Sequence, residues 1–241
     1  MGAAYIVSFF RRYVGGDLAQ DPIWTGEHPA PGIAPARVLT SYLAPDTPDQ
    51  RLDLDRFTDP TSLARNQLGG AVVPTSLATY GWCADTFQNP CVAGDLAYND
   101  IHTEGLPRAV LGWADPAASL RLRLPDGTGD VRRFDALQMR TALDPGYWVN
   151  RVDFQDLTMT LIDGDGDRDD VTASSVGNDA LAYPSGLRRF EGHVILQQLR
   201  FPLSAFDDVD LGNIRFVRFR FSRTDAGVIH VADLAFSAGA A

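Results

Sequence analysis

The sequence predicts a mainly β protein, an antiparallel β-sandwich preceded by one short N-terminal helix and a Pro/Gly-rich linker. The first observation is a period of two. Apolar and polar residues alternate through many short segments, as in strands with one face in a core and one face outside. The second observation is that Asp, Gly, Pro and Asn separate these segments at the spacing of sandwich strands. After the first helix, no helical period is longer than two turns.

The N-terminal segment is predicted to be a helix over residues 3–14, ending at Gly15 and Gly16. Residues 17–36 are rich in Pro, Gly and Ala, which favours an extended linker. The helix carries an apolar stripe that it cannot bury alone, so it must pack on the sandwich, on a separate chain or on a second copy. The stripe consists of Ile6, Phe9, Phe10 and Tyr13.

Eight segments are predicted strands. Alternation is clearest from Phe216 to Phe221, where apolar residues and arginines take opposite faces. Residues 58–108 mix short apolar runs with loops and receive no strand assignment. The predicted strands are 37–44, 109–113, 119–124, 134–143, 157–163, 193–203, 214–222 and 228–237.

Composition excludes several classes of function. The net charge of -10 argues against nucleic acid or an anionic membrane as the main partner. All 21 basic residues are arginine, which excludes a Schiff-base lysine, a pyridoxal phosphate anchor and a Walker-type phosphate site. No stretch reaches the ~18 apolar residues of a membrane span.

Cys83 and Cys91 lie eight positions apart in a loop-like stretch with Asn89 and Pro90 between them. A local disulfide would stabilise the fold by roughly 2–3 kcal/mol and would imply an oxidising compartment. The alternative is a pair of reduced, buried thiols.

Asp163, Asp165 and Asp167 alternate with glycines in a run that begins like a calcium-binding loop. The EF-hand pattern then fails, because Arg168 and Ser174 stand where Gly and Glu are needed. The alternative is a polar hairpin turn between two strands, since Asp-Gly favours such turns.

A group of aromatic residues lies near predicted strand ends or loops, unlike the core-patterned phenylalanines. Such rings can stack on sugar rings or polymer chains if they are exposed. Ordinary packing is the alternative for each one. The group consists of Tyr80, Trp82, Trp113, Tyr147, Trp148 and Tyr183.

The sequence assigns no catalytic residue. It contains no G-x-S-x-G elbow, no H-E-x-x-H and no Gly-rich phosphate loop. The four histidines (His28, His102, His193 and His230) are scattered, and the three glutamates lie in loops or the linker. A triad assembled only in space stays open as an alternative.

The second half of the chain resembles the jelly-roll β-sandwiches of carbohydrate-binding modules. The resemblance covers about residues 109–238 and rests on FDALQMRTAL, LTMTLIDGDG, LQQLRFPLSAF and VDLGNIRFVRFRFSRTDAGVIHVADLAFS, in this order. It implies a ligand-binding sandwich that often holds a structural calcium ion near an aspartate of the last strand, here Asp233. The alternative for Asp233 is a carboxylate that caps a turn.

The whole chain also resembles the C-terminal region of secreted actinobacterial α/β-hydrolase-like proteins, which are relatives of lipases and esterases. AAYIVSFFRRYVGGD is similar to their last helix, and LDLDRF, LARNQLGGAVV and the two cysteines are similar to the region that follows. The nucleophile elbow, acid and histidine of that family have no matching positions here. Residues 1–36 are therefore expected to be the remnant of a hydrolase domain, and 37–241 the β-sandwich domain.

These inferences combine into one hypothesis. The chain is expected to be a secreted, non-catalytic accessory sandwich whose signal peptide is not in this sequence. It would bind a glycan or polymer surface or support an α/β-hydrolase catalytic domain. The alternatives are a hydrolase (esterase or glycosidase) with an unrecognised site, and a purely structural domain with a large apolar patch around Phe9, Phe10 and Trp24.

Overall fold

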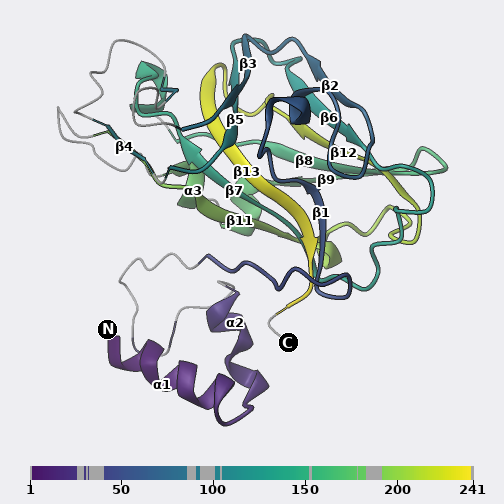
Figure 1. Cartoon of the computed structure of the whole chain (residues 1–241). Helices are drawn as coiled ribbons and strands as arrows, with labels where there is room; N and C mark the ends of the chain where they lie inside the picture. The colour runs from purple at the N-terminus through teal and green to yellow at the C-terminus, as the bar shows by residue number, and fades with distance from the viewer. Residues whose placement is uncertain are drawn as a thin grey trace.

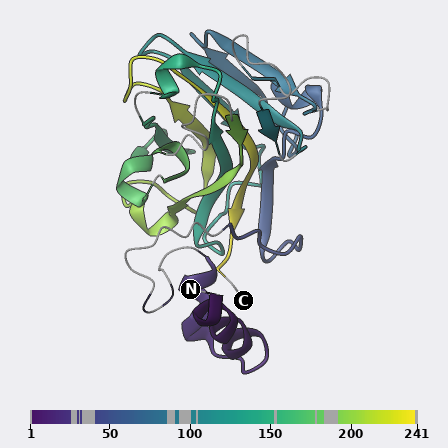
Figure 2. The same ribbon diagram turned by 90° about the vertical axis from the view of Figure 1, so that its left-hand side faces the viewer.

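The computed structural model describes residues 2–25, 30, 32, 41–85, 91–92, 101–103, 105–151, 154–177, 179–182 and 192–239. Two antiparallel sheets pack face to face, and the N-terminal helices lie below one end of them in both views (Figures 1 and 2). The prediction of a mainly β sandwich preceded by a short helix is confirmed. The predicted domain boundary at residue 36 lies outside the described residues.

The N-terminal helix α1 spans Gly2–Tyr13, and a short helix α2 spans Asp21–Trp24. Trp24 packs edge-on against Tyr5 and Phe9 of α1. Much of the remaining apolar side of α1 is exposed, including Ile6 and Phe10. Within the described part of the chain, no helix is long and apolar enough to cross a membrane.

The first sheet has β13 at its centre, the long yellow strand in Figure 1. Every pairing in it is antiparallel, and β1 (Arg51–Asp55) pairs with the second half of β13 after a bulge. The strand order is β11 (Gln197–Pro202), β7 (Ala136–Leu143), β13 (Gly227–Ser237), β5 (Arg108–Trp113) and β3 (Thr79–Cys83).

The second sheet is also antiparallel, and β12 lies at its centre. A separate parallel pair joins β4 (Ile101–Thr103) to β10 (Gly192–Val194), and a short helix α3 spans Asp179–Ala182. The order of the second sheet is β2 (Val72–Thr75), β6 (Ser119–Arg123), β12 (Ile214–Arg220), β8 (Thr158–Asp163) and β9 (Arg168–Thr172).

The core lies between the two sheets and is filled by alternate side chains of both. Leu120 and Leu122 of β6 face Ile229 and Val231 of β13 across the same buried cluster. At one end, Trp113 stacks on Phe221 with ring centroids 4.6 Å apart. The period-two pattern therefore places its apolar residues as predicted.

The outer faces of the two sheets differ. In the first sheet, β5 and β13 are buried along their whole length, so both of their faces are covered. In the second sheet, β6 alternates between buried leucines and exposed arginines, so its outer face is open.

The edge strands contain residues that discourage pairing with another strand. Pro74 lies in the edge strand β2, and Pro202 ends the edge strand β11. Proline has no backbone N–H to donate to a neighbouring strand. The remaining edge of the second sheet, β9, begins with Arg168, Asp169 and Asp170.

Most predicted strands are present with shifted ends. The predicted segment 193–203 is divided into β10 and β11. The predicted strand 37–44 is not found where it can be checked, because 41–44 form no strand and 37–40 lie outside the described residues. Instead, Tyr42 donates its N–H to Gln198 Oε1 and accepts from Gln138 Nε2 at its carbonyl, so this segment runs beside the first sheet. Four further strands, β1, β2, β3 and β4, lie outside the predicted segments, and β9 is the second strand of the hairpin that was the alternative for the aspartate run.

Candidate functional site

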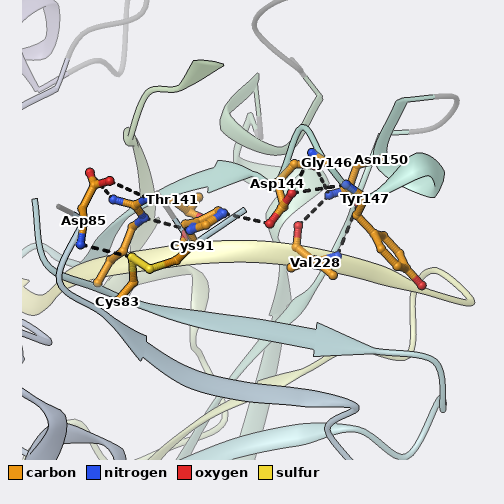
Figure 3. A network of polar contacts seen from close by, with 11 residues as sticks. Cys83, Asp85, Cys91, Thr141, Asp144, Gly146, Tyr147, Asn150 and Val228 are labelled. Carbon is orange, nitrogen blue, oxygen red and sulfur yellow. Dashed lines mark hydrogen bonds and ion pairs between the residues drawn. A yellow bond between two sulfur atoms is a disulfide. The ribbon is translucent and has the colours of Figure 1, made fainter. Parts of the chain in front are cut away.

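The outer face of the first sheet carries a buried polar network that crosses β5, β13 and the end of β7 (Figure 3). At one end, Arg108 of β5 forms an ion pair with Asp85, and both side chains are buried. Its Nη2 donates to Asp85 Oδ1 over 3.1 Å. Asp85 lies two residues after Cys83, so the ion pair holds the start of the loop that the disulfide closes.

His230 of β13 continues the network and is fully buried. Arg108 donates from Nε to His230 Nδ1 over 2.8 Å, so this nitrogen carries no proton. The proton is therefore on Nε2, which lies 3.2 Å from Asp144 Oδ2. Burial lowers the pKa of His230 and keeps the ring neutral, although Asp144 acts in the opposite direction.

Asp144 and Asn150 fix the loop that follows β7. Asp144 Oδ1 accepts from the N–H groups of Gly146 and Tyr147, and Asn150 Nδ2 donates to the carbonyls of Asp144 and Val228 (Figure 3). A buried carboxylate and a buried amide thus hold the two ends of the segment 144–150, which makes the loop rigid.

The fixed loop presents an aromatic surface. Tyr147 packs over Cys83, Val110 and Val228 on the outer face of the first sheet. The next residue, Trp148, begins the 3₁₀ helix Trp148–Arg151 and is 68% exposed. An indole held on a rigid loop and open to solvent can stack on the apolar face of a ligand ring without first being ordered.

The other predicted ligand-binding aromatics are not gathered with Trp148. Trp113 is only 1% exposed, so it belongs to the core and its assignment to a ligand surface is corrected. Tyr80 and Trp82 are half-buried at the edge strand β3, and their polar atoms donate to the carbonyls of Leu63 and Phe57. Tyr183 lies outside the described residues.

The aspartate run forms the polar hairpin turn between β8 and β9, so that interpretation is confirmed. Asp163 is buried and its Oδ1 accepts from the N–H groups of Asp165, Gly166 and Asp167. Burial alone would raise the pKa of Asp163, but these amides and that of Asp210 hold it below its usual value. Asp165 and Asp167 are exposed.

Asp233 lies at the bulge of β13, with a positive φ of 49°. It forms ion pairs with Arg140 and Arg56. Among the described residues, no group of three His, Cys, Asp or Glu side chains is placed to hold a metal ion. Calcium at Asp233 or at Asp163, Asp165 and Asp167 stays a prediction.

The disulfide between Cys83 and Cys91 is present, with the Cα atoms 5.9 Å apart. It closes the short loop predicted from the spacing, and Asp85 donates its N–H to Cys83 Sγ over 3.2 Å. The covalent link and the Asp85–Arg108 ion pair therefore hold the same segment.

His230, the one histidine whose side chain the structure describes, does not lie in an accessible hydrolytic site. His230 and Asp144 are paired as in a triad, but both side chains are buried and the second ring nitrogen accepts from Arg108. His102 and His193 are register partners in the β4–β10 pair. His28 lies outside the described residues.

An open cleft of about 870 Å³ lies between α2 and one end of the first sheet. Polar groups of Asp21, Thr25, Gln50, Asp135 and Ser204 line it. Its one aromatic lining residue, Phe134, belongs to the core, so the cleft offers no exposed ring for stacking.

The polar network was not predicted from the sequence, because its members are far apart along the chain. Arg108 and His230 are separated by 122 positions, and His230 and Asp144 by 86. The one available signal was an arginine at the start of an otherwise apolar strand, at Arg108.

No model of a protein family and no curated protein matches the chain. Among solved structures, a family 11 carbohydrate-binding module of a Clostridium thermocellum cellulosomal cellulase is 11% identical and has a TM-score of 0.44, covering 79% of this chain and 95% of that one. A family 30 module from a cellulase of the same organism is 16% identical and has a TM-score of 0.42, covering 78% of this chain and 98% of that one. The agarase AgWH50C has a TM-score of 0.42 at 7% identity, covering 80% of this chain and 25% of that one. Likenesses of this degree assign neither a ligand nor a role to this chain.

Proposed function

We propose that this chain is a non-catalytic accessory β-sandwich that binds a glycan or polymer surface through the loop of Trp148. The observation that carries the proposal is the exposed indole of Trp148, on a loop that the hydrogen bonds of Asp144 and Asn150 hold in place. A large exposed ring on a rigid support loses little conformational entropy on binding.

The proposal also includes an accessory role beside a hydrolase outside the cell. The disulfide supports an oxidising compartment. The exposed apolar side of α1, with Ile6 and Phe10, supports contact with another domain.

A depletion assay on insoluble polysaccharides and polyesters tests the ligand-binding function. We expect the purified chain to be retained on one of these polymers. Trp148→Ala should weaken this retention about tenfold or more, because truncation of an aromatic anchor removes most of its binding energy. Phe10→Ala is the matched control, since it removes an exposed ring from α1 and should leave retention unchanged.

Two results would contradict the proposal. Retention on none of the polymers would remove the binding function, and equal retention of Trp148→Ala and wild type would remove Trp148 from the site. An arm with EDTA tests the calcium prediction separately, because only a bound metal makes retention depend on the chelator.

A further inference from the structure

The open outer face of the second sheet is dominated by arginines. In β6, β12 and β9 the core residues alternate with outward-pointing arginines, and Phe216 of β12 shares the outer face with these arginines. We call this surface the arginine face; it comprises Arg121, Arg123, Arg168, Arg218 and Arg220.

Strand register places these arginines side by side. Arg121 of β6 is directly opposite Arg218 of β12. In the neighbouring row, Phe216 lies between Arg123 on one side and Ile162 on the other, and Ile162 is followed by Arg168. The Arg121 guanidinium lies over the Phe216 ring, 4.8 Å from its centroid.

Most of the positive charge on this face has no counter-charge. Arg220 donates to Asp170 over 2.6 Å, and Arg123 lies 3.7 Å from Asp126 at the edge of the sheet. Within the described ranges, no carboxylate forms an ion pair with Arg121, Arg168 or Arg218. This excess of cations stands on a chain whose net charge is -10.

The arrangement costs stability in the unbound protein. Like charges directly opposite each other on neighbouring strands repel. The Nε of Arg218 is buried without a hydrogen-bond partner. Burial, together with the nearby Arg220, lowers the pKa of Arg218, although Asp170 acts in the opposite direction. An anion placed over this row would relieve the repulsion between the guanidinium groups.

We infer that the arginine face binds an acidic polysaccharide whose sugars carry carboxylates. The planar fork of a guanidinium matches a carboxylate in two parallel hydrogen bonds. Phe216 and Ile162 lie side by side in the row between Arg123 and Arg168, and they supply an apolar strip for the C–H face of a sugar ring. The sheet surface suits an extended chain, and the overall negative charge disfavours a densely charged polymer such as nucleic acid.

This second surface lies on the opposite side of the sandwich from Trp148. It rests on the proposed function only for the class of ligand, a glycan, and it does not require the Trp148 loop. Failure of either site can therefore be seen while the other still binds.

The experiment is affinity electrophoresis of the whole chain, at low salt, in gels that contain polygalacturonate. A gel that contains the same polymer with its carboxylates methyl-esterified is the matched ligand. We expect retardation by the acid form alone, and it should disappear at high salt because exposed charges are screened. Arg121→Gln/Arg218→Gln should weaken binding about tenfold or more, since each loses a hydrogen bond to a charged group.

Arg11→Gln/Arg132→Gln is the control variant, because it removes two exposed arginines outside this face that are paired with Asp17 and Asp130. It should bind as wild type does, and so should Trp148→Ala. Thermal unfolding checks that each variant is folded.

Several results would overturn the inference. These are equal retardation by the esterified polymer, unchanged binding of Arg121→Gln/Arg218→Gln, or equal retardation by single-stranded DNA. Self-association of the chain at low salt without retardation by polygalacturonate would show instead that a second copy covers the face. Loss of neutral-polymer retention in Trp148→Ala would leave this result intact.

Discussion

The charged side chains on the outer faces of the two sheets differ in whether they are paired. On the first sheet, Arg108, Asp85, His230 and Asp144 are buried and each has a partner. On the second sheet, Arg121 and Arg218 are opposite each other in register, and no described carboxylate pairs with them. Both faces belong to one sandwich, so the difference comes from what covers each face.

Covering a face requires its charges to be satisfied. A buried charge without a partner costs several kcal/mol, so the residues under the loops form closed hydrogen-bonded pairs. Water can solvate an open face, so unpaired arginines persist there at a modest cost. Pairing thus separates charges that hold the fold together from charges available to a ligand.

The largest expected effect is on the covered face. Asp85→Ala leaves Arg108 buried without its carboxylate, so the free energy of unfolding should fall by about 3–5 kcal/mol. Urea unfolding followed by tryptophan fluorescence measures this change. Asp130→Ala breaks the exposed pair with Arg132 and should change stability little. Similar losses in the two variants would show that burial does not set the value of a charge here.

A smaller effect is expected from pH. The folded state lowers the pKa of His230, so its neutral form stabilises the protein fully above the ordinary histidine pKa of 6.5. This contribution is lost as the pH falls from 6.5 through the lower folded pKa. The charged groups that face the ring are Arg108 and Asp144, with Asp85 beyond Arg108.

Urea unfolding at several pH values compares wild type with His230→Gln, and the wild type should lose more stability below pH 6.5. The contribution of Asp55 to stability depends on pH in the opposite direction. Burial raises the pKa of Asp55 to about 6, so its contribution to the free energy of unfolding is lost as the pH rises. Both chains contain Asp55, so the difference between them isolates His230. Parallel curves would exclude this role of His230.

The smallest expected effect comes from the arginine face, where removing charge should stabilise the fold rather than destabilise it. Arg121→Gln/Arg218→Gln should raise the free energy of unfolding by about 0.2–1 kcal/mol, because it removes repulsion between opposite strands. High salt should bring wild type and variant together. A loss of stability in low salt would mean that these arginines support the fold, and it would remove the contrast between the two faces.

Sequence patterning predicted those parts of the fold that alternate strongly. The run from Phe216 to Phe221 gave both the position of β12 and the outward direction of its arginines. By contrast, β9 has one core residue, Val171, among charged residues, so it carries almost no apolar signal. In β5 both faces are covered, which explains why Trp113 could not be distinguished from an exposed ring.

The candidate sites were predicted less completely, for a physical reason. Trp148 was identified because an aromatic residue in a loop is unusual, whereas its support depends on contacts from Val228, 78 positions away. The partners of His230 likewise come from other strands. Only the register of the sheets brings such groups together, and no local segment of the sequence predicts that register.

On the proposed function, the prolines of the edge strands would matter wherever many copies bind one polymer. Copies bound side by side on a polymer would reach high local concentrations, at which unpaired sheet edges can pair with one another and aggregate. Pro74 and Pro202 each remove a backbone donor from an edge, and the charged start of β9 repels a similar neighbour. Copies crowded on a polymer would therefore resist pairing through the edges at β2, β9 and β11.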